Sequence, residues 1–286
     1  MSNSYIKLMR PFHWVKNLLL FVPIFFSGEL TNPTKLFYLL IGFIAFSFVA
    51  SSVYVLNYIR DVDKDRLHPK KKYRPIASGA VSIRHAYGLL ALLLVISFLL
   101  LLFLAFTADN YLGIIGLPLL YLAINIAYSN GLKNIPLVDV IIIALGFIIR
   151  LFFGAIIVNV VISSSLFLTV VSVSLFLGFG KRRNELKRGT KTRKVLQAYN
   201  MQFLDKIMYV CIDLSLVFYS LWALNGHSRD VVWTVPLAMI IVMDYCLIIE
   251  GNNSDGDPAE VLKHSKSLMC LLLLFICALF GCIYLS

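Results

Sequence analysis

Long apolar stretches separated by short polar segments dominate the chain. Nine of them have about the length of a membrane span, although the first and the fourth are short. They cover roughly 15–28, 36–60, 85–106, 110–128, 136–158, 162–180, 206–225, 230–250 and 266–285. The ten-residue alternation of outer-membrane barrels is absent from the sequence. The pattern therefore predicts an all-α, polytopic membrane protein with about nine transmembrane helices.

Basic residues indicate how these helices cross the membrane. All but three of the 26 Lys and Arg residues lie at the N-terminus or around the loops that follow even-numbered stretches. The exceptions are Lys35 and Arg229 on the other side, and Arg150 inside the fifth stretch. By the positive-inside rule, the N-terminus and the long loops 61–84 and 181–205 are expected to be cytoplasmic. A hydrophilic substrate should therefore arrive from the cytoplasm.

Composition narrows the class of protein further. The 286 residues are 59% hydrophobic and 14% charged, which is too apolar for a soluble domain of this length. Five cysteines lie inside apolar stretches without a CxxC pair, so we expect free thiols. P-loop, dinucleotide, zinc-protease and nucleophilic-serine motifs are absent from the sequence, and no nucleic-acid partner is predicted. We predict one domain over residues 1–286.

An acidic segment follows the second apolar stretch. Asn57, Asp61 and Asp65 are spaced i, i+4, i+8, which places three oxygen ligands on one face of a continuing helix. Mg²⁺ in proteins takes one or two carboxylates together with substrate phosphates and water. We predict these three residues as metal ligands. The alternative is that the acids only neutralise neighbouring basic residues at a solvated helix end.

A basic, proline-containing loop comes next. Pro69 and Pro75 end the helix, and the cations between them include Lys71 and Arg74. Arginine can bind phosphate with a bidentate fork, so Lys71 and Arg74 are candidate phosphate ligands. The alternative is a cationic loop at an anionic lipid surface, worth about 1 kcal/mol for each Lys or Arg.

Further candidates lie where later apolar stretches begin or end. Tyr128 and Lys133 close the fourth stretch, where the alternative role is an interfacial anchor. Arg150 lies so deep in the fifth stretch that it costs at least about 2.5–3.5 kcal/mol without a partner. Asp139 precedes it by about three turns on the same face. Gly178 and Gly180 permit close helix packing just before the cations Lys181, Arg182 and Arg183.

Taken together, these motifs resemble the UbiA superfamily of intramembrane prenyltransferases. The first acidic motif of that family matches Asn57, Asp61 and Asp65, followed by Arg74-Pro75-Ile76-Ala77-Ser78-Gly79. The resemblance covers nearly the whole chain. It implies a helical bundle with a cytoplasm-facing active-site cavity and Mg²⁺ on Asn57, Asp61 and Asp65.

Two departures from the family pattern concern charge. Tyr58 stands where many members have Asp, and Lys181-Arg182-Arg183-Asn184-Glu185 replaces a second acidic motif. The replacement suggests a phosphate-bearing donor held by direct charge pairing. One branch of the superfamily, the decaprenyl-phosphate phosphoribosyltransferases, is similar in these features. Its motifs resemble the segments 10–17, 68–77, 128–133, 138–139, 146–150 and 180–186.

The branch implies transfer of 5-phosphoribosyl from PRPP to a decaprenyl-type polyprenyl phosphate, which releases pyrophosphate and forms polyprenyl-phosphoryl-5-phosphoribose. It implies Lys16, Arg74 and Lys133 at phosphate oxygens, and Lys181 and Arg182 at the ribose 5-phosphate or the acceptor phosphate. Asp139 and Arg150 would orient the donor or pair with each other. A homotrimer in the plasma membrane, serving cell-wall biosynthesis, also follows from the resemblance. The alternatives are a prenyltransferase acting on an aromatic acceptor and, disfavoured by the massed carboxylates, a transporter or lipid-binding scaffold.

Overall fold

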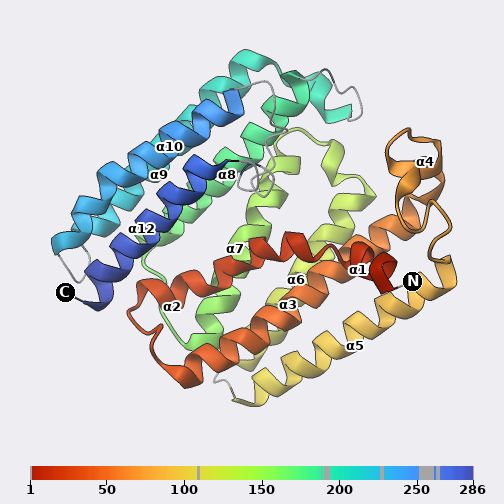
Figure 1. The fold of residues 1–286 in the computed structure, drawn as a ribbon, viewed down its shortest axis with the longest axis horizontal. Coiled ribbons are helices and arrows are strands. Elements are labelled where there is room, and N and C mark those ends of the chain that lie inside the picture. The colour runs from red at the N-terminus through yellow and green to blue at the C-terminus, as the bar shows by residue number, and fades with distance from the viewer. Residues whose placement is uncertain are drawn as a thin grey trace. The chain divides into compact units, whose positions relative to one another are not determined.

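The computed structural model describes residues 2–107, 110–187, 189, 194–225, 229–250, 261 and 265–285. All secondary structure in this part of the chain is helical, as predicted (Figure 1). Eight helices are long and apolar enough to cross a membrane. They include α3 (Pro33–Arg60), α5 (Ile83–Thr107), α6 (Tyr111–Asn130), α7 (Val138–Val158), α8 (Ser164–Lys187), α9 (Met201–Leu224), α10 (Val235–Glu250, preceded by η5, Arg229–Thr234) and α12 (Lys266–Tyr284).

The first expected span has a different form. Residues Pro11–Phe26 form a shorter apolar helix, in which the 3-10 segment η1 (Pro11–Phe21) leads into α2 (Val22–Phe26). A 3-10 helix rises about 2.0 Å per residue against 1.5 Å for an α-helix. The combined segment therefore reaches about 30 Å, the thickness of a bilayer core. The shorter helical elements are α1 (Ser2–Met9), α4 (Val62–Leu67), η2 (Lys71–Tyr73), η3 (Leu132–Asn134) and η4 (Lys194–Ala198).

Two compact units make up the chain. Unit 1 contains Met1–Asn130 and Ile149–Val160, and unit 2 contains Gly131–Ile148 and Val161–Ser286. Helix α7 thus begins in unit 2 and ends in unit 1. The single domain expected from the sequence stays a prediction.

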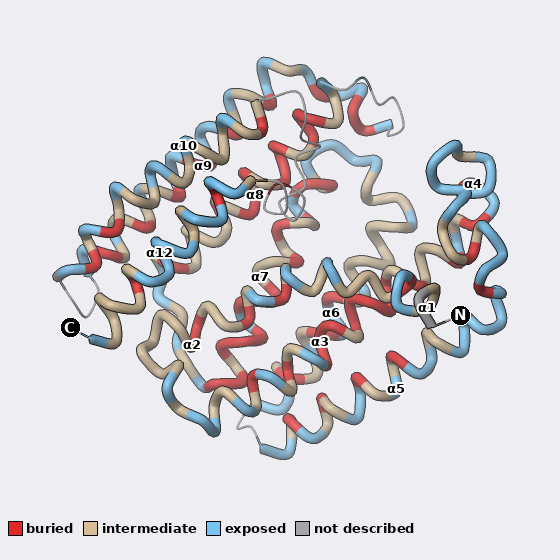
Figure 2. The backbone as a smooth tube through the Cα atoms, viewed as in Figure 1, coloured by how far each residue is buried: buried red, intermediate tan, exposed pale blue. Residues whose placement is uncertain are grey.

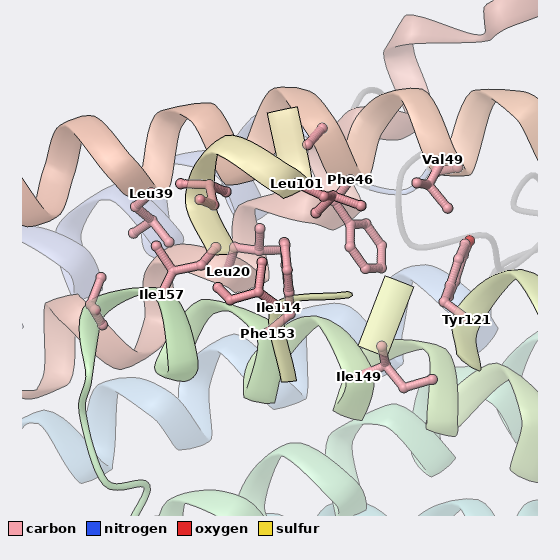
Figure 3. Close-up of a cluster of buried hydrophobic side chains, with 14 of the residues drawn as sticks. Leu20, Leu39, Phe46, Val49, Leu101, Ile114, Tyr121, Ile149, Phe153 and Ile157 are labelled. Atoms are coloured by element: carbon pink, nitrogen blue, oxygen red, sulfur yellow. The ribbon is translucent and has the colours of Figure 1, made fainter. Parts of the chain in front are cut away.

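Helix α3 forms the centre of unit 1. It packs against α5, α6 and η1, and a large apolar cluster surrounds it, with Phe46, Tyr121 and Phe153 among its members (Figure 3). A Cβ on Gly154 of α7 would collide with the backbone carbonyl of Leu20 in η1, so only glycine allows this close approach. The chain before α3 is therefore packed tightly inside unit 1.

Unit 2 is organised around the pair α8 and α9, which also contacts η5 and α10. Phe176, Leu204 and Met208 belong to its buried apolar cluster. A Cβ on Gly178 would lie 2.7 Å from Cγ1 of Val140, whereas one on Gly180 would make an ordinary contact 3.5 Å from the sulfur of Met208. The expected role in close helix packing is confirmed for Gly178 alone.

Lipid-facing character is clearest on α10 and α12. In each, only 11% of the most apolar 18-residue window is buried, against 61% in α3. Much of both helices is exposed (pale blue in Figure 2). Met243, Leu247 and Leu273 are among their exposed apolar residues. A bilayer accommodates such apolar surface, so the chain is a multi-pass membrane protein. All five cysteines are free, as predicted.

Candidate functional site

The predicted metal ligands lie at the junction of α3 and α4. The backbone N–H of Asp61 donates to the carbonyl of Asn57 at 3.0 Å, and that of Asp65 donates to the carbonyl of Asp61 at 2.8 Å. The i to i+4 bonding of an α-helix therefore continues across the junction. Asn57, Asp61 and Asp65 consequently follow one another on the same side, one turn apart, as their spacing predicts.

Asp65 is the most enclosed of the three, with 3% of its surface exposed. Its Oδ2 accepts a hydrogen bond of 2.7 Å from Nη1 of Arg74. The guanidinium carbon of Arg74 also lies 4.9 Å from the ring centroid of Tyr58. Arg74 thus bonds to a carboxylate and lies over an aromatic ring, while 31% of its side chain stays exposed.

The segment after Arg74 explains how the arginine is presented. Its backbone N–H donates to Lys71, and its carbonyl accepts from the N–H of Ser78, both at 2.9 Å. Ile76 is 2% exposed and belongs to an apolar cluster with Val55, Ile59 and Val62. Gly79 adopts φ +79°, a conformation that favours glycine. The motif from Arg74 to Gly79 is therefore a compact turn that holds the arginine beside the acidic residues.

The C-terminal end of α6 supports the same site. Ser129 donates from Oγ to Oδ1 of Asn57 at 2.8 Å, and Asn130 accepts a hydrogen bond from Arg60. An amide oxygen has two lone pairs, so this contact leaves Oδ1 of Asn57 able to bind a metal. Residues that orient a ligand in this way often affect metal affinity as strongly as the ligands. Tyr128, which precedes Ser129, is half-buried.

These donors suit a small, hard cation. Within the described ranges, no group of three or more His, Cys, Asp or Glu side chains could hold a metal by itself. Asn57, Asp61 and Asp65 instead supply one amide and two carboxylates, while Arg74 engages only one oxygen of Asp65. Mg²⁺ characteristically combines few protein oxygens with phosphate and water oxygens. The residues therefore fit Mg²⁺ bound together with a phosphate-bearing ligand.

Deeper in unit 1, Arg150 is 6% exposed. Its Nε donates to Oδ1 of Asn17 at 2.7 Å, and its Nη2 donates to the hydroxyl of Tyr121 at 3.0 Å. The guanidinium also lies over the rings of Phe46 and Tyr121. Asn17 donates in turn to Ser47 on α3. Arg150 therefore ties η1, α3 and α6 together. Lys16, which precedes Asn17 in η1, is half-buried.

A second polar cluster belongs to unit 2. Arg182, with no exposed surface, donates to Asp139 at 2.5 Å and to Glu185 at 2.8 Å. Asp139 also accepts from the hydroxyl of Tyr199, which itself accepts from the backbone N–H of Leu137, both at 2.7 Å. Burial, reinforced by the nearby Asp139 carboxylate, raises the pKa of Tyr199 to about 12. Asp139 is thereby fixed by two donors, and its basic partner is Arg182 rather than Arg150, the alternative expected from the sequence.

The geometry of Arg182 adds a role that its sequence position does not indicate. A contact with a substrate phosphate requires its surroundings to open, because its side chain is enclosed and paired. The expected phosphate contact stays a prediction, and the structure adds the positioning of Asp139. Lys133 and Lys181 are half-buried, and Lys71 is exposed.

Several supporting residues were missed from the sequence. Asn17, Ser129 and Tyr199 are uncharged, and their partners lie 133, 72 and 60 positions away in the chain. Asn17 and Ser129 fall inside the segments 10–17 and 128–133, whose resemblance to the branch motifs is the one sequence feature that points to them. Tyr58 was noted only as a departure, and its contact with Arg74 could not be inferred from spacing.

Comparison with known proteins assigns the family. The model of the UbiA prenyltransferase family matches residues 18–196. A decaprenyl-phosphate phosphoribosyltransferase from Mycolicibacterium smegmatis is 33% identical over 99% of this chain and 93% of its own length. One from Corynebacterium glutamicum is 30% identical over 99% and 88%. The chain belongs to the UbiA prenyltransferase family of membrane transferases.

The fold agrees with that assignment. A UbiA homolog from Archaeoglobus fulgidus, in a structure bound to DMAPP and Mg²⁺, superposes with a TM-score of 0.71. The match covers 98% of this chain and 99% of the other at 20% sequence identity. This confirms the predicted UbiA-like helical fold.

Proposed function

We propose that this protein transfers 5-phosphoribosyl from PRPP to a polyprenyl phosphate of decaprenyl type, releasing pyrophosphate. The observation that carries the proposal is the near full-length similarity to decaprenyl-phosphate phosphoribosyltransferases. The product would be polyprenyl-phosphoryl-5-phosphoribose. The cations in 181–183, where prenyltransferases of the family carry acidic residues, support the same donor.

The reaction needs no general base. An oxygen of the lipid phosphate is already anionic, so it can attack C1 of PRPP directly as the bond from C1 to the pyrophosphate oxygen breaks. Attack opposite the leaving group would convert an α donor to a β product. The protein has to position the two reactants and stabilise the charge that develops on pyrophosphate.

The residues of unit 1 suit that task. Asn57, Asp61 and Asp65 would hold Mg²⁺, which neutralises negative charge on the leaving pyrophosphate. Arg74 donates to Asp65 through one N–H and can direct others to a phosphate. Ser129 keeps the amide of Asn57 oriented. Among the further candidate phosphate ligands, Lys16 belongs to unit 1, whereas Lys133 and Lys181 belong to unit 2. Arg150 of unit 1 and Asp139 of unit 2 are candidates for orienting the donor.

The basic residues favour a cytoplasmic site. PRPP is hydrophilic and cytosolic, and the segment from Asn57 to Gly79 lies on the side that the positive-inside rule makes cytoplasmic. We therefore place the protein in the plasma membrane with its N-terminus and active site facing the cytoplasm. A homotrimer is part of the same proposal.

Prenyl transfer to an aromatic acceptor is the second candidate. The fold shared with a DMAPP-bound UbiA homolog favours it. Against it, the carboxylates near 181–185 are paired with arginines, which weakens their ability to bind a second metal. Arg182 pairs with Asp139 and Glu185, and Arg183 pairs with Asp205 and Glu250.

Purified protein in detergent separates the two candidates. Radiolabelled PRPP with decaprenyl phosphate and Mg²⁺ should give a labelled lipid, and EDTA should abolish its formation. The Asp61→Asn variant, folded as judged by its thermal midpoint, should lose most of the activity. A parallel assay offers labelled prenyl diphosphate with an aromatic acid. Labelled product in that assay alone would overturn the proposal. If neither pair of substrates gives product, the result would favour a transporter or a scaffold.

A further inference from the structure

Tyr58 lies beside the acidic motif and contacts Arg74, an arginine that also bonds to the predicted metal ligand Asp65. We propose that Tyr58 is a positioning residue that keeps Arg74 available to a substrate diphosphate by stacking on its guanidinium. The proposal deepens the phosphoribosyl-transfer function above and rests on it for the identity of the natural donor. It assigns the ligand chemistry as a magnesium diphosphate.

The two contacts of Arg74 leave part of the guanidinium unused. One N–H of Arg74 donates to Oδ2 of Asp65 at 2.7 Å, and the guanidinium carbon lies over the ring of Tyr58, 4.9 Å from its centroid. A guanidinium carries five N–H donors in one plane. A ring stacked on the face occupies none of these donors. With 31% of the side chain exposed, Arg74 can therefore bind a phosphate without leaving Asp65.

The ring is held firmly. Tyr58 is half-buried and packs against the apolar cluster that contains Val55, Ile59 and Val62. Tyr58 directly follows the predicted metal ligand Asn57. Arg74, which lies over its ring, donates a hydrogen bond to Asp65, two turns beyond Asn57. Tyr58 therefore fixes Arg74 relative to the first and the last of the three acidic-motif residues.

Charge explains why an aromatic residue suits this position. An aspartate here would add a second carboxylate beside Arg74 and offset its positive charge. It would also compete for the N–H groups that a phosphate needs. A tyrosine attracts the cation through its ring quadrupole and leaves the net positive charge in place. Tyr58 thus supports binding of a polyanion.

The chain offers a matched control in the same loop. Lys72 lies 5.2 Å from the ring of Tyr73, so this pair is also a cation over a tyrosine. Tyr73 is 75% exposed, and the described contacts of this pair do not reach the acidic motif. Replacing Tyr73 removes a ring from under Lys72 and leaves the ring of Tyr58 under Arg74 in place.

The test uses full-length protein and two readouts: the Kd of inorganic pyrophosphate in the presence of Mg²⁺, and the KM of PRPP. Tyr58→Leu should raise both by about 10- to 100-fold, as for other residues that orient a ligand group, with a smaller effect on kcat. Tyr58→Phe and Tyr73→Leu should leave both close to wild type. Tyr58→Asp should weaken pyrophosphate binding at least as much as Tyr58→Leu.

Coupling to Arg74 identifies the route of the effect. In an Arg74→Gln background, Tyr58→Leu should cause little further loss, because the cation that the ring attracts is already gone. If Tyr58→Leu proves unstable, Tyr58→Met fills similar volume without a ring and takes its place. Wild-type pyrophosphate affinity in a folded Tyr58→Leu protein, or an equal loss in Tyr73→Leu, would overturn the proposal. The two proposals can fail separately. If wild-type protein transfers no phosphoribosyl group but Tyr58→Leu still weakens pyrophosphate binding, the role of Tyr58 is sustained and the proposed function is refuted.

Discussion

At the scale of single residues, the arginines differ more in their partners than in their sequence context. Arg182 and Arg183 each engage two carboxylates, and Arg150 engages an amide and a phenol. Arg74 has one carboxylate and one ring. Since a phosphate must also be able to reach the N–H groups, the part-exposed Arg74 is better suited to it than the buried consecutive arginines of α8.

Tyr199 provides a residue-scale test of the Asp139 cluster. Tyr199→Phe leaves an oxygen of Asp139 and the N–H of Leu137 without their partner. We expect the free energy of unfolding to fall by about 1–3 kcal/mol, the usual cost of unsatisfied buried groups. Thermal or denaturant unfolding in detergent measures the change. Tyr209→Phe, which removes an exposed phenol bonded to Glu250, is the control and should cost less.

The same phenol should make stability depend on pH at the alkaline end. The pKa of Tyr199 rises from 10.0 to about 12 on folding, so the folded state holds its proton more tightly than the unfolded state. Its contribution is complete below pH 10 and is lost as the pH rises toward 12. The stability gap between wild type and Tyr199→Phe should therefore narrow across this window. A constant gap would contradict the assignment.

At the scale of elements, Gly154 tests how closely η1 and α7 pack inside unit 1. Gly154→Ala places a methyl group against the backbone carbonyl of Leu20, which cannot rotate away. We expect destabilisation of at least about 1–3 kcal/mol, the usual cost of overpacking, measured by thermal unfolding in detergent.

Gly116 of α6 is the matched control for Gly154. A Cβ there would meet nothing within 4 Å. Gly116→Ala should therefore be neutral or stabilising by up to about 1 kcal/mol, because alanine is the better helix former. Equal effects of the two substitutions would show that helix propensity, rather than contact with η1, decides the outcome.

Elements were predicted well where apolar length and i, i+4 spacing determine them. The long helices and the single face shared by Asn57, Asp61 and Asp65 follow from local pattern. The 3-10 form of Pro11–Phe21 does not, because its packing on Gly154 depends on a distant segment. For the same reason, the pairing of Arg182 with Asp139, 43 positions apart, could not be read from charge alone.

At the scale of the whole molecule, the distribution of basic residues predicts which loops face the cytoplasm. In a cysteine-free background, Thr31→Cys and Ala80→Cys each add one thiol at an exposed position. A membrane-impermeant maleimide should label Thr31→Cys on intact cells and Ala80→Cys only after permeabilisation. The opposite labelling pattern would show that the predicted orientation is wrong and that the acidic motif faces the outside of the cell.

Arg150 bears on the order in which the protein is made. Three of its partners, Asn17, Phe46 and Tyr121, precede it in the chain. When α7 emerges from the ribosome, the segments that receive the guanidinium have therefore already been synthesised. Insertion of a charged helix, which is costly in isolation, becomes a docking step onto a half-built protein. Early segments thus act as a template for the later helix.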